Sequence, residues 1–305
     1  MRDVRATGGS DTAAPIAARI VELYHTARRD LFPGEADTAA VGPLVGFAAG
    51  DDPLFTDFKQ HVGASHWTPL EAFALAFPRL PAAAAELTVI SWILPHPEQV
   101  KADNRRETRL PAESWALGKL RGERLNNALR EQTVKLLAET GVAAIAPAGM
   151  AQWTAGALTS VWSERHVAYA AGSGTFGLCD GLITPVGKAM RCGSVVARLA
   201  LPATPRTYSD HHAYCLWYAE KRCGACMARC PADAISASGH DKAKCLAYLK
   251  AVRREYLEPR FALSTNACGL CQTRVPCESR IPAKGGAEGD AQPCGTAGDD
   301  SPSPE

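Results

Sequence analysis

The first 178 residues of this 305-residue chain contain no cysteine, and all eleven cysteines follow Leu178. The chain also lacks an apolar run close to the 18 residues of a membrane-spanning helix. Its first residues show neither the apolar stretch nor the twin-arginine pair of an export signal. These absences favour a cytoplasmic protein without a membrane partner, where a disulfide framework is not expected. The cysteines therefore indicate a local cysteine site in the C-terminal part of the chain.

The chain also lacks a surplus of charge of either sign. The chain carries 33 Lys and Arg against 32 Asp and Glu, a formal net charge of +1. This balance gives no reason to expect nucleic acid as the main partner, because binding to phosphate backbones needs a strong positive field. No P-loop is present either, which argues against chemistry driven by nucleotide hydrolysis.

Apolar runs and helical periodicity predict alternating helices and strands as far as about residue 205. The expected helices cover residues 11–31, 114–140 and 163–172, and the expected strands cover 87–94, 142–147 and 192–201. Residues 32–86 are rich in Pro, Gly and Ala, and we expect only short helices there. The alternation predicts an α/β or α+β layer fold.

Composition divides the chain into four parts. We expect a helical N-terminal region over residues 1–85, an α/β domain over 86–210, a cysteine-rich domain over 211–282 and a disordered tail over 283–305. The tail has no aliphatic residue larger than alanine, so it has little to bury on folding. Cys294 lies within the tail and is not expected to belong to the cysteine site.

Eight of the cysteines form two groups of four. The first is Cys215, Cys223, Cys226 and Cys230, with Pro231 after the last, and the second is Cys245, Cys268, Cys271 and Cys277. In two-cluster ferredoxins the cysteine before proline binds the other cluster. This rule predicts one [4Fe–4S] cluster on Cys215, Cys223, Cys226 and Cys277, and a second on Cys230, Cys245, Cys268 and Cys271. Glu220 stands where such a run normally has its first cysteine, so Cys215 takes that place on a longer loop.

Two other interpretations of these cysteines stay open. Zinc sites also use Cys-x2-Cys pairs, but one such site needs only four thiolates and leaves four cysteines unexplained. A thioredoxin-type redox pair explains fewer still. Residues 211–282 carry eleven Lys and Arg against six Asp and Glu, a surplus that suits anionic clusters and suits a solvated basic face equally.

The segments CGACMARCPADAI, KCLAYLK and ACGLCQ, in this order, resemble the C-terminal ferredoxin domain of the epoxyqueuosine reductase family, to which reductive dehalogenases are related. Upstream, SERHVAYAAGSGTFG (163–177) resembles the family's segment beside the corrinoid. The resemblance implies an α+β fold: a nitroreductase-like α/β layer domain with a C-terminal bacterial-ferredoxin-like domain that holds two [4Fe–4S] clusters. It also implies a cobalamin that receives electrons through the clusters and reductively cleaves a bond in a small-molecule substrate. An external electron donor of the ferredoxin or flavodoxin type would supply the clusters.

Carried over to this sequence, the resemblance assigns roles to particular residues. Backbone close to the corrinoid would come from a glycine-rich turn, which an ordinary helix end would also explain: Gly172, Gly174, Thr175 and Gly177. Lys188 and Arg191 would bind propionamide or substrate groups. His166 and Tyr169, one helical turn apart, are candidates for the proton donor.

The chain departs from the family at two places. The family has an acidic general acid shortly before the pair matched by Glu164 and Arg165, whereas this chain has GALTSV at 156–161. The residues after Cys271 are QTRVPC, which is longer than the family's spacing to its last cysteine. The alternative function is therefore an electron-transfer protein of ferredoxin type that binds no corrinoid and docks a redox partner.

Overall fold

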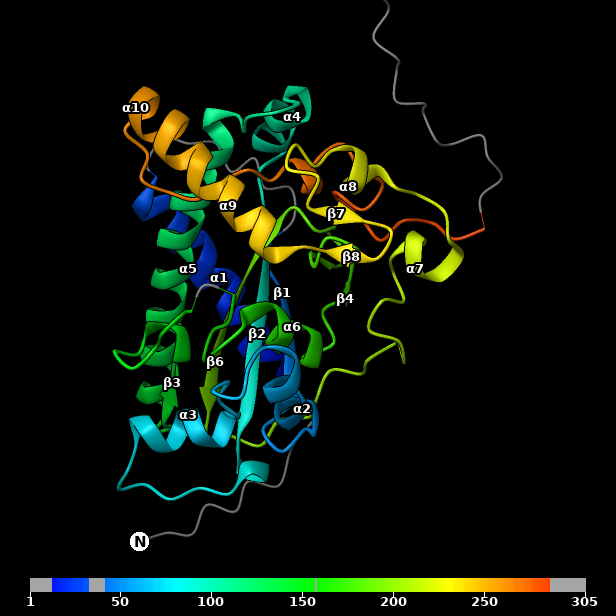
Figure 1. Cartoon of the computed structure of the whole chain (residues 1–305). Helices are drawn as coiled ribbons and strands as arrows, with labels where there is room; N and C mark the ends of the chain where they lie inside the picture. The colour runs from blue at the N-terminus through cyan, green and yellow to red at the C-terminus, as the bar shows by residue number, and fades with distance from the viewer. Residues whose placement is uncertain (1–12, 33–41, 157, 286–305) are drawn as a thin grey trace, which may run out of the picture.

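A four-stranded sheet lies at the centre of this computed structural model, which describes residues 13–32, 42–156 and 158–285 (Figure 1). Neighbouring strands are antiparallel throughout, in the order β1-β2-β6-β3. The strands are β1 (Leu44–Ala49), β2 (Thr88–Pro95), β6 (Met190–Ala197) and β3 (Ala144–Ile145). The two central strands are apolar and almost wholly buried, because helices cover both faces of the sheet.

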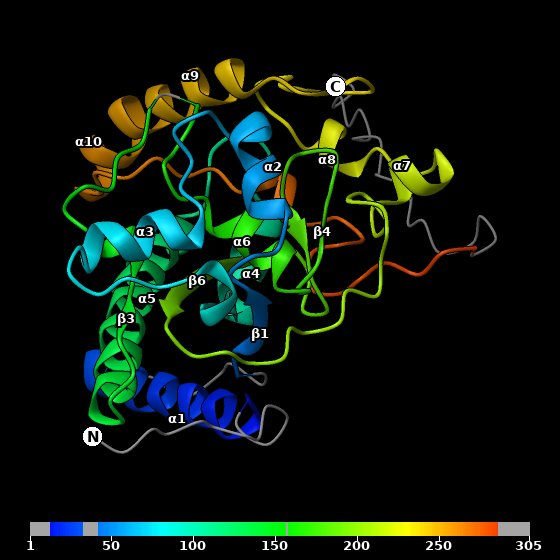
Figure 2. The same ribbon diagram turned by 90° about the horizontal axis from the view of Figure 1, so that it is seen from below.

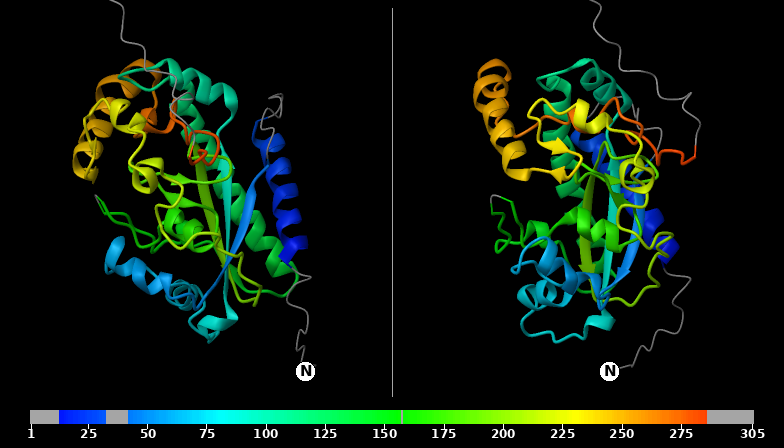
Figure 3. Two further views of the ribbon diagram at one scale, coloured as in Figure 1. Left: turned by 90° about the vertical axis from the view of Figure 1, so that its right-hand side faces the viewer. Right: turned by 45° about the vertical axis from the view of Figure 1, so that its right-hand side comes forward.

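Successive residues of the central strands face opposite helical layers. Ile90 and Trp92 pack with α1 (Ala13–Leu31) and α5 (Glu113–Glu139), whereas Val89 packs on the other side. The second layer is made of α2 (Leu54–His61), α3 (Pro69–Ala76) and α6 (Glu164–Ala170). Seen from below, α1 and α5 lie on one side of the sheet and α2, α3 and α6 on the other (Figure 2). The described residues therefore form a three-layer body, which Figure 3 shows from its side.

One buried amide ties the longest helix to the sheet. Asn126 of α5 is fully buried and accepts a hydrogen bond from the Trp92 indole over 2.7 Å. Its Nδ2 donates to the carbonyl oxygen of Cys192 over 2.8 Å. Because both polar ends of the amide have partners, it fixes the position of α5 without the cost of an unpaired buried group.

Residues 211–285 lie across one end of the sheet (Figure 1). Val252, Leu257 and Leu263 pack there against Trp115 and Ala116 at the start of α5. The elements outside the sheet and its two layers are short: η1 (Ala84–Glu86), α4 (Glu98–Arg106), η2 (Pro147–Gly149), β4 (Thr175–Phe176), β5 (Leu182–Ile183), α7 (Leu216–Glu220), α8 (Ala225–Ala228), β7 (Ile235–Ser236), β8 (Gly239–His240), α9 (Lys242–Val252), η3 (Arg253–Leu257), α10 (Glu258–Phe261) and η4 (Leu270–Gln272).

The structure confirms the helices and strands expected from the apolar runs, within a few residues at their ends. The N-terminal region over 1–85, expected to be helical, also contains a strand, because β1 pairs along its whole length with β2. Sequence patterns hid β1, which contains a glycine and two alanines. Gly46 is required there, since a Cβ at this position would lie 2.4 Å from the carbonyl oxygen of Ala171. Most of the predicted tail, with Cys294, lies outside the described residues.

Within the described ranges, no helix has the length and apolar character needed to cross a bilayer.

Candidate functional site

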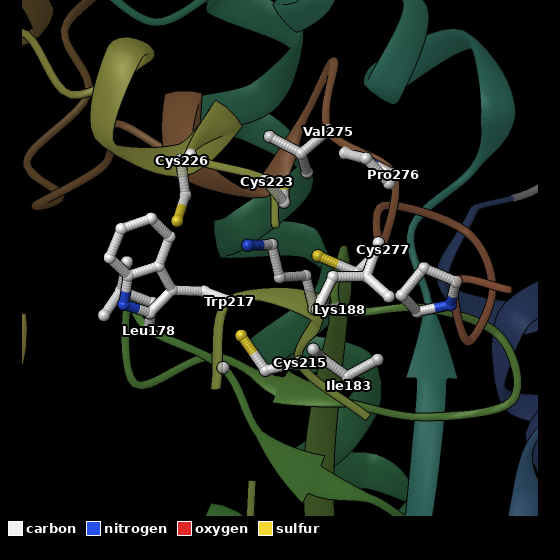
Figure 4. Close-up of a pocket in the computed structure, with 14 residues that line it drawn as sticks. Leu178, Ile183, Lys188, Cys215, Trp217, Cys223, Cys226, Val275, Pro276 and Cys277 are labelled. Carbon is white, nitrogen blue, oxygen red and sulfur yellow. The ribbon is translucent and has the colours of Figure 1, made fainter. Parts of the chain in front are cut away.

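Four cysteines from two distant segments line one cavity at the end of the sheet (Figure 4). They are Cys215, Cys223, Cys226 and Cys277, the set that ferredoxin spacing assigns to one cluster. Leu178, Ile183 and Trp217 complete much of the wall. The structure thus brings together side chains that are more than fifty positions apart in the sequence.

The local backbone places these cysteines at unusual turns. Cys215 is the N-cap of α7, and the chain then passes through Lys221 and Cys223, whose φ angles are 55° and 77°. Non-glycine residues adopt this left-handed conformation rarely, and such outliers gather at functional sites. Cys226 follows on α8, where it is buried. Cys277 is held by the segment just before β6, because the amide of Lys188 donates to its carbonyl oxygen over 2.9 Å.

A buried lysine points into the same cavity (Figure 4). Lys188 is only 3% exposed, and its Nζ lies 3.2 Å from the sulfur of Cys179. Burial acts to lower the pKa of Lys188, but the surrounding thiols, above all those of Cys179 and Cys277, hold it well above its usual value. The ammonium therefore stays charged and faces sulfur instead of water.

Members of the second cysteine group also lie near one another. Burial, together with the neighbouring Cys245 and Cys230, raises the pKa of Cys268 to about 11. Hydrogen bonding with Cys179, burial and the nearby Cys268 raise the pKa of the partly buried Cys271. Cys268 therefore lies close enough to Cys230, Cys245 and Cys271 for their charges to interact.

Within the described ranges, no three His, Cys, Asp or Glu side chains are close enough together to hold a single metal ion. Two sets of four thiols nevertheless fit iron–sulfur clusters, because thiolates are the ligands that these clusters use. A cluster also fills the space between its ligands, as a cavity lined by four cysteines would allow. The charged Lys188 beside the sulfurs suits an anionic group.

One arginine joins the two cysteine groups. Arg229, next to Cys230, is 8% exposed, and its guanidinium donates to four backbone carbonyls. The acceptors are Leu270 and Thr273 beside the second group and Asn104 and Glu107 at the end of α4. The buried guanidinium therefore fixes the two motifs relative to each other.

The glycine-rich turn that the resemblance assigns to a corrinoid is enclosed by protein. A Cβ on Gly174 would lie 2.2 Å from the carbonyl oxygen of Ile183, and one on Gly177 would lie 3.3 Å from the Cδ1 of Ile183. Gly172 has a φ of 74°, and a Cβ there would lie 3.2 Å from the Cγ2 of Thr204. Thr175 is fully buried, and its hydroxyl accepts from the amide of Tyr214 over 2.9 Å. These residues are engaged by the protein itself, so they form no cradle that fits a corrinoid.

The spacing of Gly172, Gly174 and Gly177 also matches the loop of dinucleotide-binding folds. That loop leads from a strand into a helix, whereas this turn leads from α6 into β4. The match therefore carries no prediction of nucleotide binding.

Lys188 and Arg191, expected to bind one ligand, have different partners. Lys188 faces the cysteine cavity. Arg191 forms an ion pair with Glu123 of α5, and its side chain passes close to Gly122. Burial lowers the pKa of Arg191. The structure does not give these two cations a common contact.

His166 and Tyr169 share one face of α6, as their spacing predicts. Both rings pack on Phe176, with centroid distances of 4.8 and 5.6 Å. The Nδ1 of His166 lies 2.8 Å from the Ser163 hydroxyl, and burial lowers the pKa of His166 to about 3. Burial raises the pKa of Tyr169. At neutral pH the imidazole is therefore uncharged, and of the two only the tyrosine hydroxyl is an acid with its proton in place.

A second buried histidine makes the fold sensitive to acid. His66 stacks on Trp162 and accepts from the amide of Ser163 over 3.1 Å, and burial lowers its pKa from 6.5 to about 4. Below pH 6.5 His66 becomes protonated in the unfolded chain but stays neutral in the folded protein, so the free energy of unfolding falls as the pH drops toward 4. The full contribution of His66 to the free energy of unfolding is about 3 kcal/mol.

We expect urea midpoints to fall between pH 7 and 4.5, and His66→Gln to make that fall smaller. The exposed His61→Gln is the matched control and should keep the wild-type slope; equal slopes for all three proteins would contradict the assignment.

Sequence reasoning missed Cys179, which the structure places between the two cysteine groups. It is 5% exposed, and its thiol is within hydrogen-bonding reach of Cys226 and Cys271. No other cysteine lies within ten residues of it on either side, so spacing gave no signal.

No protein-family model matches the chain, and no curated protein matches it. Among solved structures, one is described as a reductive dehalogenase structure that suggests a mechanism for B12-dependent dehalogenation. It is 16% identical, with a TM-score of 0.50 over 78% of this chain and 30% of that one. A catabolic reductive dehalogenase in complex with 3-bromo-4-hydroxybenzoic acid is 15% identical, with a TM-score of 0.51 over 88% of this chain and 37% of that one.

An epoxyqueuosine reductase from Bacillus subtilis is 16% identical, with a TM-score of 0.47 over 88% of this chain and 68% of its own. The chain thus spans about a third of the length of the dehalogenases and about two thirds of this reductase. At these identities the likeness is one of fold. In its mixed α/β fold, the chain is similar to reductive dehalogenases.

Proposed function

We propose that the chain is an iron–sulfur oxidoreductase that passes electrons through two [4Fe–4S] clusters held by its C-terminal region, a ferredoxin-like domain. One observation carries this proposal: Cys215, Cys223, Cys226 and Cys277 line a single cavity into which Lys188 points. Ferredoxin-like spacing in the sequence groups the same four thiols. Bound clusters would supply one-electron transfer.

The chain's own residues have separate roles in this proposal. The eight cysteines bind iron as thiolates, and Lys188 offsets their negative charge. Trp217, Leu178 and Ile183 keep water from the cavity wall. Cys223 is exposed, whereas Cys215 and Cys226 are buried. We therefore place the entry of electrons from an external donor, of the ferredoxin or flavodoxin type, at Cys223.

Two electron acceptors are possible for such a chain. The similarity in fold to dehalogenases supports a bound cobalamin that reductively cleaves a substrate bond. Such a corrinoid would need a site other than the turn from Gly172 to Gly177, which protein atoms enclose. That enclosure supports the second acceptor, a protein partner docked by a chain that binds no corrinoid.

Metal analysis after anaerobic purification with cobalamin supplied tests the proposal. We expect about eight irons and about eight sulfides per chain, the content of two [4Fe–4S] clusters. Cobalt retained at about one per chain would identify the cobalamin-dependent reductase and justify a substrate screen. Iron and sulfide without cobalt would identify the electron carrier. Zinc in place of iron would refute the proposal and leave a zinc-stabilised interaction module.

A further inference from the structure

Cys179 occupies a position that the two predicted clusters do not use. It lies in the loop between β4 and β5, where the amide of Gly177 donates to the carbonyl oxygen of Gly181 over 2.8 Å and closes a tight turn. From this turn its side chain packs in one buried cluster with Cys226, predicted for the first iron–sulfur cluster, and Cys271, predicted for the second. Cys179 therefore lies beside a cysteine of each set.

Lys188 completes this contact. Its Nζ lies 3.2 Å from the Cys179 sulfur, with only 3% of the residue exposed. The same ammonium points into the cavity that Cys277 of the first set also lines. A thiol and a cation therefore lie together at the junction of the two sets, shielded from solvent.

We propose that Cys179 and Lys188 form a bridge between the two clusters, which binds no iron itself and raises the reduction potentials of the clusters it touches. This inference rests on the proposed function, because it needs both clusters in place. The eight cysteines of the two groups already complete the ligand sets, so Cys179 packs beside ligand sulfurs without being needed as a ligand itself.

The physical basis is the charge that a cluster gains on reduction. A hydrogen bond to a ligand sulfur, or a cation beside it, stabilises the reduced and more negative form. The effect is large where water does not screen it, because the interaction of two charges grows as the effective dielectric constant falls. Lys188 is buried among sulfurs, which is the condition for a strong effect.

The test uses anaerobically purified full-length protein with three variants and one control. Cys179→Ala removes the shared thiol, Lys188→Met removes the cation, and Lys188→Arg keeps it. Cys192→Ala is the matched control, since Cys192 is also buried but has Met190 as its sulfur neighbour. Iron and sulfide contents are measured first, and EPR-monitored redox titrations then give the reduction potentials.

We expect Cys179→Ala and Lys188→Met to keep the wild-type iron content but to show lower reduction potentials. Lys188→Arg and Cys192→Ala should remain close to wild type. Loss of about half the iron in Cys179→Ala would overturn the inference by making Cys179 a ligand. Unchanged potentials in Cys179→Ala would overturn it too, and this variant decides the question if Lys188→Met does not fold. Wild-type protein without iron would instead refute the proposed function.

Discussion

Replacing Cys226 with serine should remove about half of the iron and sulfide, leaving about four irons per chain, because one of the two clusters loses a thiolate. A serine oxygen is a harder and weaker ligand for iron than a thiolate. Cys226 is buried in the wall of the cavity. Iron and sulfide analysis of anaerobically purified protein measures the effect.

Cys192→Ser provides the control for this prediction. Cys192 is as buried as Cys226, but it lies on β6 and outside both cysteine sets. Its replacement should leave the iron content at the wild-type level. Iron that stays unchanged in Cys226→Ser would show that the ligand assignment is wrong, and equal loss from both variants would point to instability instead of ligation.

Replacing Arg229 with leucine should lower the free energy of unfolding by about 4 kcal/mol, because four backbone carbonyls lose their donor in a buried place. The residue is 8% exposed, and its guanidinium donates to carbonyls of α4 and of the segment around the second cysteine group. Leucine fills part of the space but donates nothing. Anaerobic urea titration of the iron-loaded protein, followed by tryptophan fluorescence, measures the shift in midpoint.

Arg254→Ala is the matched control, since this arginine has a side chain that is 72% exposed and pairs only with the neighbouring Glu255. Its replacement should change the free energy of unfolding by less than about 0.5 kcal/mol. A midpoint for Arg229→Leu that equals the control's would show that the four carbonyls find other partners and that the guanidinium does not hold the motifs together.

The sheet could be predicted from the sequence where its strands are continuous apolar runs. This applies to β2 and β6, whose residues are mostly buried on both faces. The helix α5 could be predicted as well, because it is 27 residues long. Prediction fails for β1, because the close approach of Ala171 selects a small residue at Gly46 and weakens the strand pattern. Local propensity cannot report a constraint imposed by a segment far along the chain.

The candidate site, too, could be predicted from the sequence only in part. The ferredoxin spacing grouped Cys215, Cys223, Cys226 and Cys277, and these four line one cavity in the structure. Cys179 has no such spacing, and it joins the site only through the fold of the β4–β5 turn. The resemblance placed Lys188 at a corrinoid, but its partners are sulfurs. Charge alone does not show which neighbour a buried cation will meet.

The strands of the sheet and the cysteines of the cavity are synthesised at different times, because the last cysteine comes late in the sequence. All four strands of the sheet have been made once Ala197 is added, whereas the cavity lacks its last cysteine until Cys277. The sheet can therefore form before the cavity is complete, and the cysteine segment then closes onto it. In the proposed function, delivery of iron and sulfide would be a late step in maturation, and a nascent chain stalled before Cys277 would hold a complete sheet and an open cavity.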